Sequence, residues 1–116
     1  MINQVFVAKA FKREAKKLLK NYPTFKKSIE DLINKLTENP FIGVPYGAGI
    51  YKIRLSDESK GRGKSGSFRV LYFHINKTEN GIDIILMSVY DKSEKATVLK
   101  ADAIKKLKSI LDEEEF

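Results

Sequence analysis

The stretch from residue 51 to residue 75 constrains the fold of this chain more than any other part of it. Two β-type runs, Tyr51–Leu55 and Phe68–Ile75, flank a loop that is rich in lysine, arginine, glycine and serine. Because side chains alternate sides along a strand, Lys52 and Arg54 share one face of the first run and its apolar residues take the other. This pattern predicts two strands with an apolar side against helices and a basic side that faces solvent or a ligand.

The loop between the two runs concentrates positive charge. Lys60, Arg62 and Lys64 lie in it, and the acidic residues nearby are Asp57 and Glu58. The whole chain has 22 basic and 15 acidic residues, which gives a net charge of +7. A solvated basic surface without a partner is one interpretation of this charge. Its concentration between two strands favours the other, a surface that holds a phosphate polyanion such as RNA.

The remaining pattern predicts one α+β domain over residues 1–116. Two amphipathic helical segments end at Tyr22-Pro23 and at Asn39-Pro40, and residues 40–50 are rich in turn formers and predict irregular structure. The predicted order is β-α-α-β-β-β-α, with a small antiparallel sheet and a helical hairpin packed on one of its faces. The first predicted element is a strand at Ile2–Val7, and the last is a helix at Ala101–Leu111. The run Ile82–Tyr90 is apolar on both sides, which predicts a central strand.

The composition excludes several kinds of chemistry. The chain has no cysteine, so disulfides, thiolate zinc sites and cysteine nucleophiles are impossible. His74 is the single histidine, and a structural or surface role is expected for it rather than metal binding. No apolar run reaches the roughly 20 residues of a membrane span, and no signal-peptide pattern opens the chain. We therefore expect a cytoplasmic protein with no metal and no cofactor.

Arg69 is the most informative single candidate. It lies between Phe68 and Val70 in an apolar run, on the same face as Leu71 and Phe73. One interpretation is a partly buried arginine paired with a local carboxylate. The other is a fixed guanidinium that binds a phosphate, because its planar fork matches phosphate oxygens with two parallel hydrogen bonds.

Tyr90 and Lys92 follow at the end of the predicted central strand, where side chains can line a cleft. Tyr90 is a candidate for base stacking or, with a pKa lowered by adjacent cations, for accepting a proton. Lys92 adds charge to this end of the strand. An aromatic plug at a sheet edge, followed by a solvated charge run, is the structural alternative.

Three segments together resemble the RelE/ParE superfamily of bacterial toxins, and in particular its HigB-like branch. That branch tends to carry a GKSGG-x-R stretch and a YDKSE-like stretch, and Ser67 stands here for the second glycine. The order of elements and the helix-ending Asn39-Pro40 also match. The three segments are residues 51–55 (YKIRL), 63–72 (GKSGSFRVLY) and 88–94 (SVYDKSE).

The resemblance implies a toxin of a type II toxin-antitoxin system that cleaves mRNA on the ribosome and is neutralised by a cognate antitoxin. It implies attack by the ribose 2′-hydroxyl on the next phosphate, without a metal. The family's late tyrosine maps near Val98, so Tyr90 is the substitute candidate. The loop cations would bind RNA backbone. The family's basic catalytic positions map to Lys52, Arg54, Arg69 and Lys92, the last replacing an arginine of RelE-type sequences.

Two other functions remain open on the same fold. A ParE-like protein would inhibit DNA gyrase and cleave no RNA, and it would have no need for Arg54 and Arg69 at one site. A non-catalytic RNA-binding module would keep the basic face without the chemistry. Fold alone does not separate these alternatives, because function depends on the site.

Overall fold

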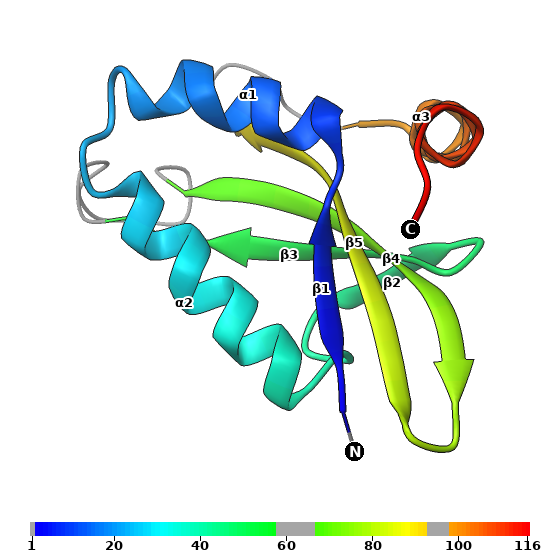
Figure 1. The fold of residues 1–116 in the computed structure, drawn as a ribbon. Helices are drawn as coiled ribbons and strands as arrows, with labels where there is room; N and C mark the ends of the chain where they lie inside the picture. The colour runs from blue at the N-terminus through cyan, green and yellow to red at the C-terminus, as the bar shows by residue number, and fades with distance from the viewer. Residues whose placement is uncertain (1, 58–66, 93–97) are drawn as a thin grey trace.

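A computed structural model describes residues 2–57, 67–92 and 98–116 (Figure 1). It has an α+β fold, as predicted, with one mixed sheet of five strands in the order β1-β5-β4-β3-β2. The elements in chain order are β1 (Gln4–Val7), α1 (Lys9–Leu19), α2 (Phe25–Glu38), β2 (Val44–Gly47), β3 (Ile50–Leu55), β4 (Phe68–Thr78), β5 (Gly81–Asp91) and α3 (Lys100–Glu113).

The sheet extends the predicted meander at both edges. β3, β4 and β5 pair antiparallel in sequence order, as predicted. β1 adds to β5 in parallel, so the sheet is not antiparallel throughout. β5 lies between β1 and β4, which agrees with its apolar residues on both sides, although the middle strand of the five is β4.

The prediction of irregular structure over residues 40–50 was wrong for its central part. Residues 44–47 form β2, which pairs antiparallel with β3 and has an irregularity between Pro45 and Gly47. Val44 and Tyr46 are of types that are enriched in strands, but proline and glycine are depleted there, so Pro45 and Gly47 obscure the sequence signal of this short edge strand. Its importance is that it carries Tyr46 to the site described below.

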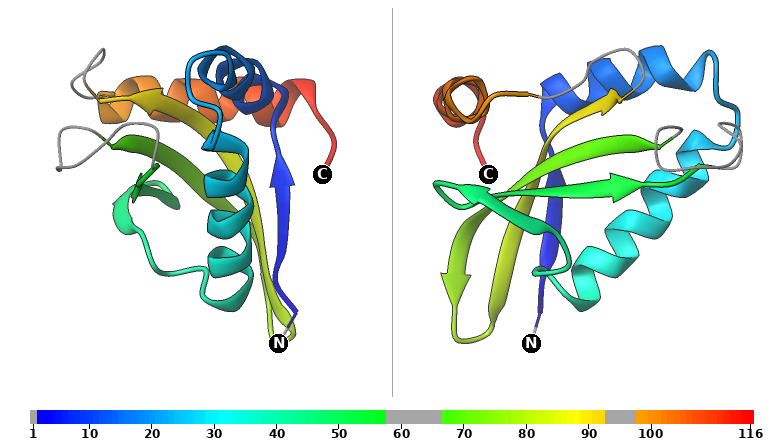
Figure 2. Two further views of the ribbon diagram at one scale, coloured as in Figure 1. Left: turned by 90° about the vertical axis from the view of Figure 1, so that its left-hand side faces the viewer. Right: turned by 180° about the vertical axis from the view of Figure 1, so that it is seen from behind.

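Two apolar cores cover the two faces of the sheet. The first core lies between the sheet and the α1–α2 pair, where Phe11, Phe25 and Leu36 pack on strand residues such as Val70 and Val89. The second core lies between the sheet and α3, which runs across the strands in Figure 2, and it contains Leu71, Met87, Ala103, Leu107 and Ile110.

The hairpin between β4 and β5 explains one glycine. Thr78 pairs with Gly81, so residues 79 and 80 form the turn at the predicted Asn80-Gly81 signal. A Cβ atom at Gly81 would lie 1.7 Å from the carbonyl oxygen of Ile2, whose N–H donates to the Asn80 carbonyl at 2.6 Å. Glycine is therefore required here because the chain before β1 passes directly against the turn.

Candidate RNA-binding and catalytic site

Three neighbouring strands bring Arg54, Arg69 and Tyr90 into one row. Arg54 of β3 pairs with Arg69 of β4, and Arg69 pairs in turn with Tyr90 of β5. Residues directly opposite in an antiparallel pair point to the same face, with Cβ atoms about 5 Å apart. The row therefore places two guanidinium groups and a phenol side by side, on the face of the sheet that α3 also covers. We call these three residues the arginine–tyrosine row.

Arg69 is buried at the centre of this row, with 7% of its surface exposed. Its Nη1 donates to Ser67 Oγ at 2.6 Å and to the Phe68 carbonyl at 3.3 Å. In the described part of the chain, no carboxylate lies within ion-pair distance of it. Burial and the neighbouring Arg54 lower the pKa of Arg69, and Tyr90 acts in the opposite direction. Because an arginine stays protonated in proteins, Arg69 is a buried cation held by neutral groups.

Tyr90 is also buried, with 8% of its surface exposed. Burial is the largest cause of a raised pKa for Tyr90, and Tyr46 adds to it. A backbone hydrogen bond with Val98 and the charge of Arg69 act against this rise without reversing it. The expectation of a lowered pKa was wrong, because the sequence revealed the nearby cations but not the burial of the phenol. At neutral pH Tyr90 is a neutral hydroxyl that can donate.

Lys52 lies on the same face as Arg54, two residues earlier on β3, and meets a tyrosine that the sequence did not single out. Its Nζ lies 4.7 Å from the centre of the Tyr46 ring. The Tyr46 hydroxyl donates to the Val98 carbonyl. Lys100, at the start of α3, places its Nζ 5.7 Å from the centre of the same Tyr46 ring. Tyr46 and Lys100 thus extend the arginine–tyrosine row toward β2 and α3.

The remaining candidates from the sequence lie outside this arrangement. Lys92 is exposed in the turn after β5, and Lys60, Arg62 and Lys64 lie outside the described residues. His74 is buried, with Nε2 2.8 Å from the Pro40 carbonyl and the ring stacked on Tyr51. Burial lowers the pKa of His74. This placement agrees with the expected structural role.

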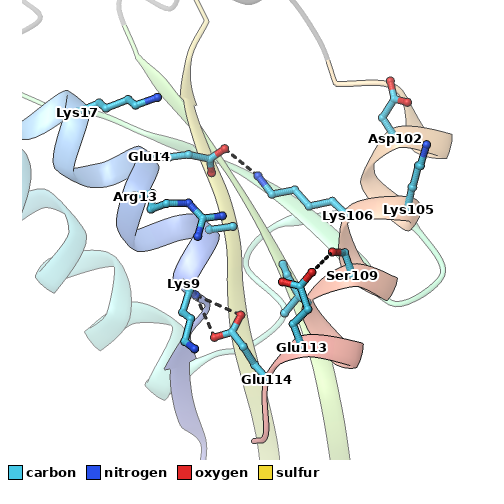
Figure 3. Close-up of a pocket in the computed structure, with 12 residues that line it drawn as sticks. Lys9, Arg13, Glu14, Lys17, Asp102, Lys105, Lys106, Ser109, Glu113 and Glu114 are labelled. Carbon is cyan, nitrogen blue, oxygen red and sulfur yellow. Dashed lines mark hydrogen bonds and ion pairs between the residues drawn. The ribbon is translucent and has the colours of Figure 1, made fainter.

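The described residues include no cluster of three or more His, Cys, Asp or Glu side chains that could hold a metal ion. In the same residues, no helix has the length and apolar character needed to cross a membrane. A groove of about 630 Å³ runs between α1 and α3 (Figure 3), but no residue of the arginine–tyrosine row lines it. Of the three residues of the row, Arg54 is exposed, whereas Arg69 and Tyr90 are buried.

Such a row matches one ligand chemistry well. Two guanidinium groups without carboxylate partners in the described residues favour an anion, and their forks suit the oxygens of a phosphodiester. A buried phenol beside them can donate to a further oxygen. The tyrosines and cations nearby supply surfaces on which unpaired bases can stack.

The fold is similar to that of a solved bacterial toxin. The chain resembles a solved structure of a mutant of the E. coli toxin RelE in the free state, with a TM-score of 0.59 and 17% sequence identity. The match covers 96% of this chain and 100% of the other. No protein-family model matches the sequence, and no curated protein matches it either. At this identity the likeness establishes the fold, and the function has to be argued from the site.

Proposed function

We propose that this protein is the toxin of a type II toxin-antitoxin system and cleaves mRNA on the ribosome. The observation that carries the proposal is the environment of Arg69. It is a buried cation between Arg54 and Tyr90, and no carboxylate of the described residues lies within ion-pair distance of it. A buried charge without an ion-pair partner among the described residues contributes no stability by itself, so the arrangement favours binding of an external anion.

The reaction that fits these groups is transesterification within the RNA. The ribose 2′-oxygen forms a bond to phosphorus, and the bond from phosphorus to the 5′-oxygen breaks. The products are a 2′,3′-cyclic phosphate and a free 5′-hydroxyl. Negative charge builds on the phosphoryl oxygens, and Arg69 with Arg54 would stabilise it in the transition state more than in the ground state.

The proton transfers need a donor and an acceptor. Tyr90 keeps its proton at neutral pH, as an ordinary phenol does, and its raised pKa extends this to higher pH. It is therefore available to donate to the leaving 5′-oxygen. Lys52, on the same face of β3 as Arg54, is the candidate for receiving the proton of the 2′-hydroxyl. This step uses the unprotonated amine, because an ammonium group has no free electron pair. In this proposal Lys60, Arg62 and Lys64 bind the phosphate backbone of mRNA or of ribosomal RNA, with an affinity that falls steeply as salt is added.

A cognate antitoxin belongs to the same proposal. The face that carries the arginine–tyrosine row is basic, so a partner that silences it is expected to be acidic where the two meet. We also propose the HigB-like branch as the closest functional class, on the three sequence segments that resemble it.

The test is to map mRNA 5′ ends by primer extension in a purified translation system, with and without ribosomes. The wild-type protein should cut only when ribosomes are present. Arg69→Ala should cut at least about 100-fold more slowly, as expected for the loss of a group that stabilises transition-state charge. Arg13→Ala removes an exposed arginine on α1 and should cut like the wild type.

Circular dichroism would confirm that Arg69→Ala is folded, and Arg69→Lys would retain the charge without the fork. Cuts that persist at full rate in Arg69→Ala would contradict the role of the row. A protein that stops bacterial growth but cuts no mRNA in any condition would contradict the endonuclease proposal. Gyrase supercoiling would then be the next assay.

A further inference from the structure

β5 contains a bulge in the middle of its length. On β4 the consecutive residues Leu71 and Tyr72 pair with Ser88 and Leu86, so Met87 is an extra residue on β5. Because side chains alternate along a strand, one extra residue reverses which side chains face which way beyond that point.

The bulge decides which face Tyr90 occupies. Before it, Ile84 and Leu86 pack in the first core, under α1 and α2. With unbroken alternation Tyr90 would follow them to that face, and Val89 would stand opposite Arg69. In the structure Val89 packs in the first core and Tyr90 pairs with Arg69. The arginine–tyrosine row therefore exists only because β5 carries the extra residue.

Glu14 of α1 holds the β5 backbone directly after that residue. Its Oε1 accepts hydrogen bonds from Ser88 Oγ at 3.0 Å and from the Val89 N–H at 3.3 Å. β1 pairs with β5 only up to the pair of Val7 with Leu86. Beyond that pair, the Glu14 carboxylate supplies the acceptor that a neighbouring strand would otherwise give to Val89.

Lys106 of α3 binds the same carboxylate from the other side. Its Nζ donates to Glu14 Oε2 at 2.7 Å (Figure 3) and to Ser88 Oγ at 3.0 Å. Both charged side chains are partly exposed, so the ion pair by itself contributes little free energy. What it does is tie α1, β5 and α3 together at the bulge. We call Glu14, Ser88 and Lys106 the Glu14 clamp.

We propose that the Glu14 clamp is a positioning device for Tyr90: by holding the bulge, Glu14 keeps the phenol beside Arg69. Glu14 is a positioning residue, since it acts on Tyr90 only through the β5 backbone at Ser88 and Val89. The kinetic side of this inference rests on the proposed function, whereas its structural side does not. Misplacing a reacting group by about 1 Å can cost about 100-fold in rate.

The structural side is tested by NMR of the protein with isotope-labelled tyrosine rings. In Glu14→Ala we expect the ring resonances of Tyr90 and Tyr46 to shift. Those of Tyr51 and Tyr72 should stay in place, because these two rings stack on each other at the opposite face of the sheet. Glu113→Ala is the matched control, because Glu113 lines the same groove and its described hydrogen bond is with Ser109 on the same helix.

The kinetic side is tested with ribosome-bound mRNA. Glu14→Ala should lower kcat about 100-fold and change KM less than about twofold, because the cations that bind RNA are untouched. Glu14→Gln keeps an oxygen for the Val89 N–H and should recover most of the rate. Lys106→Met is the second variant in case Glu14→Ala does not fold. It removes the ammonium group that binds Glu14 and Ser88 but keeps a side chain of similar length, and it should shift the Tyr90 resonances in the same direction.

Two outcomes would overturn the inference. In one, a folded Glu14→Ala protein has Tyr90 resonances as unmoved as those of Glu113→Ala. In the other, the melting temperature falls while Tyr90 and kcat stay unchanged, which would make the clamp only a brace for α3. A wild-type protein that cuts no RNA would contradict the proposed function and leave the NMR experiment to decide the clamp.

Discussion

At the scale of single residues, burial gives Arg69 and Tyr90 complementary properties. Both are more than nine-tenths buried, and they are direct neighbours across two strands. Burial lowers the pKa of Arg69 without removing its charge, and burial raises the pKa of Tyr90. A fixed cation therefore stands beside a phenol that keeps its proton. This pair suits the binding of a phosphate and the donation of a proton, and it does not suit a phenolate base.

The raised pKa of Tyr90 leads to a prediction about pH. Because the phenol stays protonated below its ordinary pKa of about 10, its contribution to rate should not change between about pH 6 and pH 9. We expect Tyr90→Phe to lower the cleavage rate by about 10- to 100-fold, with a constant ratio of wild-type to variant rate across this range. The measurement is a pair of pH–rate profiles of kcat.

A ratio that rises about tenfold per pH unit would instead mark Tyr90 as a base that acts in its ionised form. Tyr51→Phe is the control for this experiment. Tyr51 lies opposite Tyr72 on β3 and β4, packed against the first core and away from the row, and its removal should leave both rate and profile unchanged.

Alternation along strands was enough to predict some of these residues. It placed Lys52 with Arg54 and identified Arg69, whose position beside Arg54 is now visible in the register of β3 and β4. It did not find Tyr46, which reaches the site from a four-residue strand whose signal is obscured by Pro45 and Gly47. The direction of the Tyr90 pKa was also beyond reach, because burial depends on how distant segments pack.

At the scale of elements, the long periodic segments were predictable and the short or irregular ones were not. The three meander strands and all three helices occur where the apolar spacing predicted them. β2 was missed. The bulge at Met87 was missed as well, because neither neighbouring residue is a glycine that would mark it. The side chains that contact β5 beside the bulge, Glu14 and Lys106, come from segments distant in the sequence. The features that sequence spacing missed are those that shape the site.

The first core offers a prediction about the α2 anchor. Phe25 begins α2, is fully buried, and its ring centre lies 4.7 Å from that of Phe68 on β4. We expect Phe25→Ala to lower the free energy of unfolding by about 3–5 kcal/mol through lost burial and a residual cavity. Urea denaturation followed by circular dichroism would measure this.

Phe41→Ala is the matched control, because Phe41 has 53% of its surface exposed and undergoes the same change of side chain. Phe41→Ala should lower the free energy of unfolding clearly less than Phe25→Ala does. Equal losses for the two variants would show that the contact between α2 and β4 is not the anchor that its burial indicates.

At the scale of the whole molecule, the two faces of the sheet are covered differently. The α1–α2 pair closes one face with the larger apolar core. α3 covers only part of the other, and the arginine–tyrosine row lies on that same face. A net charge of +7 on 116 residues favours approach to a polyanion, and the row is the place where we propose that a phosphate binds.

The overall architecture agrees with the RelE-like fold, which the sequence resemblance had predicted from three segments. Two of those segments, residues 63–72 and 88–94, lie partly outside the described residues, so the placement of residues 63–66, 93 and 94 stays a prediction. The fold does not by itself specify a reaction, and the proposed reaction depends on the arginine–tyrosine row. The chemistry of the RNA ends is therefore the most direct test of that reaction.

The decisive measurement is the identity of the ends left on mRNA after incubation with wild-type protein and translating ribosomes. We predict 5′-hydroxyl ends, which polynucleotide kinase labels without prior phosphatase treatment, and 2′,3′-cyclic phosphates on the other fragments. These are the products of attack by the 2′-hydroxyl at a phosphate held by Arg54 and Arg69. Ends that carry a 5′-phosphate would mean that water attacks the phosphate, and they would contradict the mechanism assigned to this site.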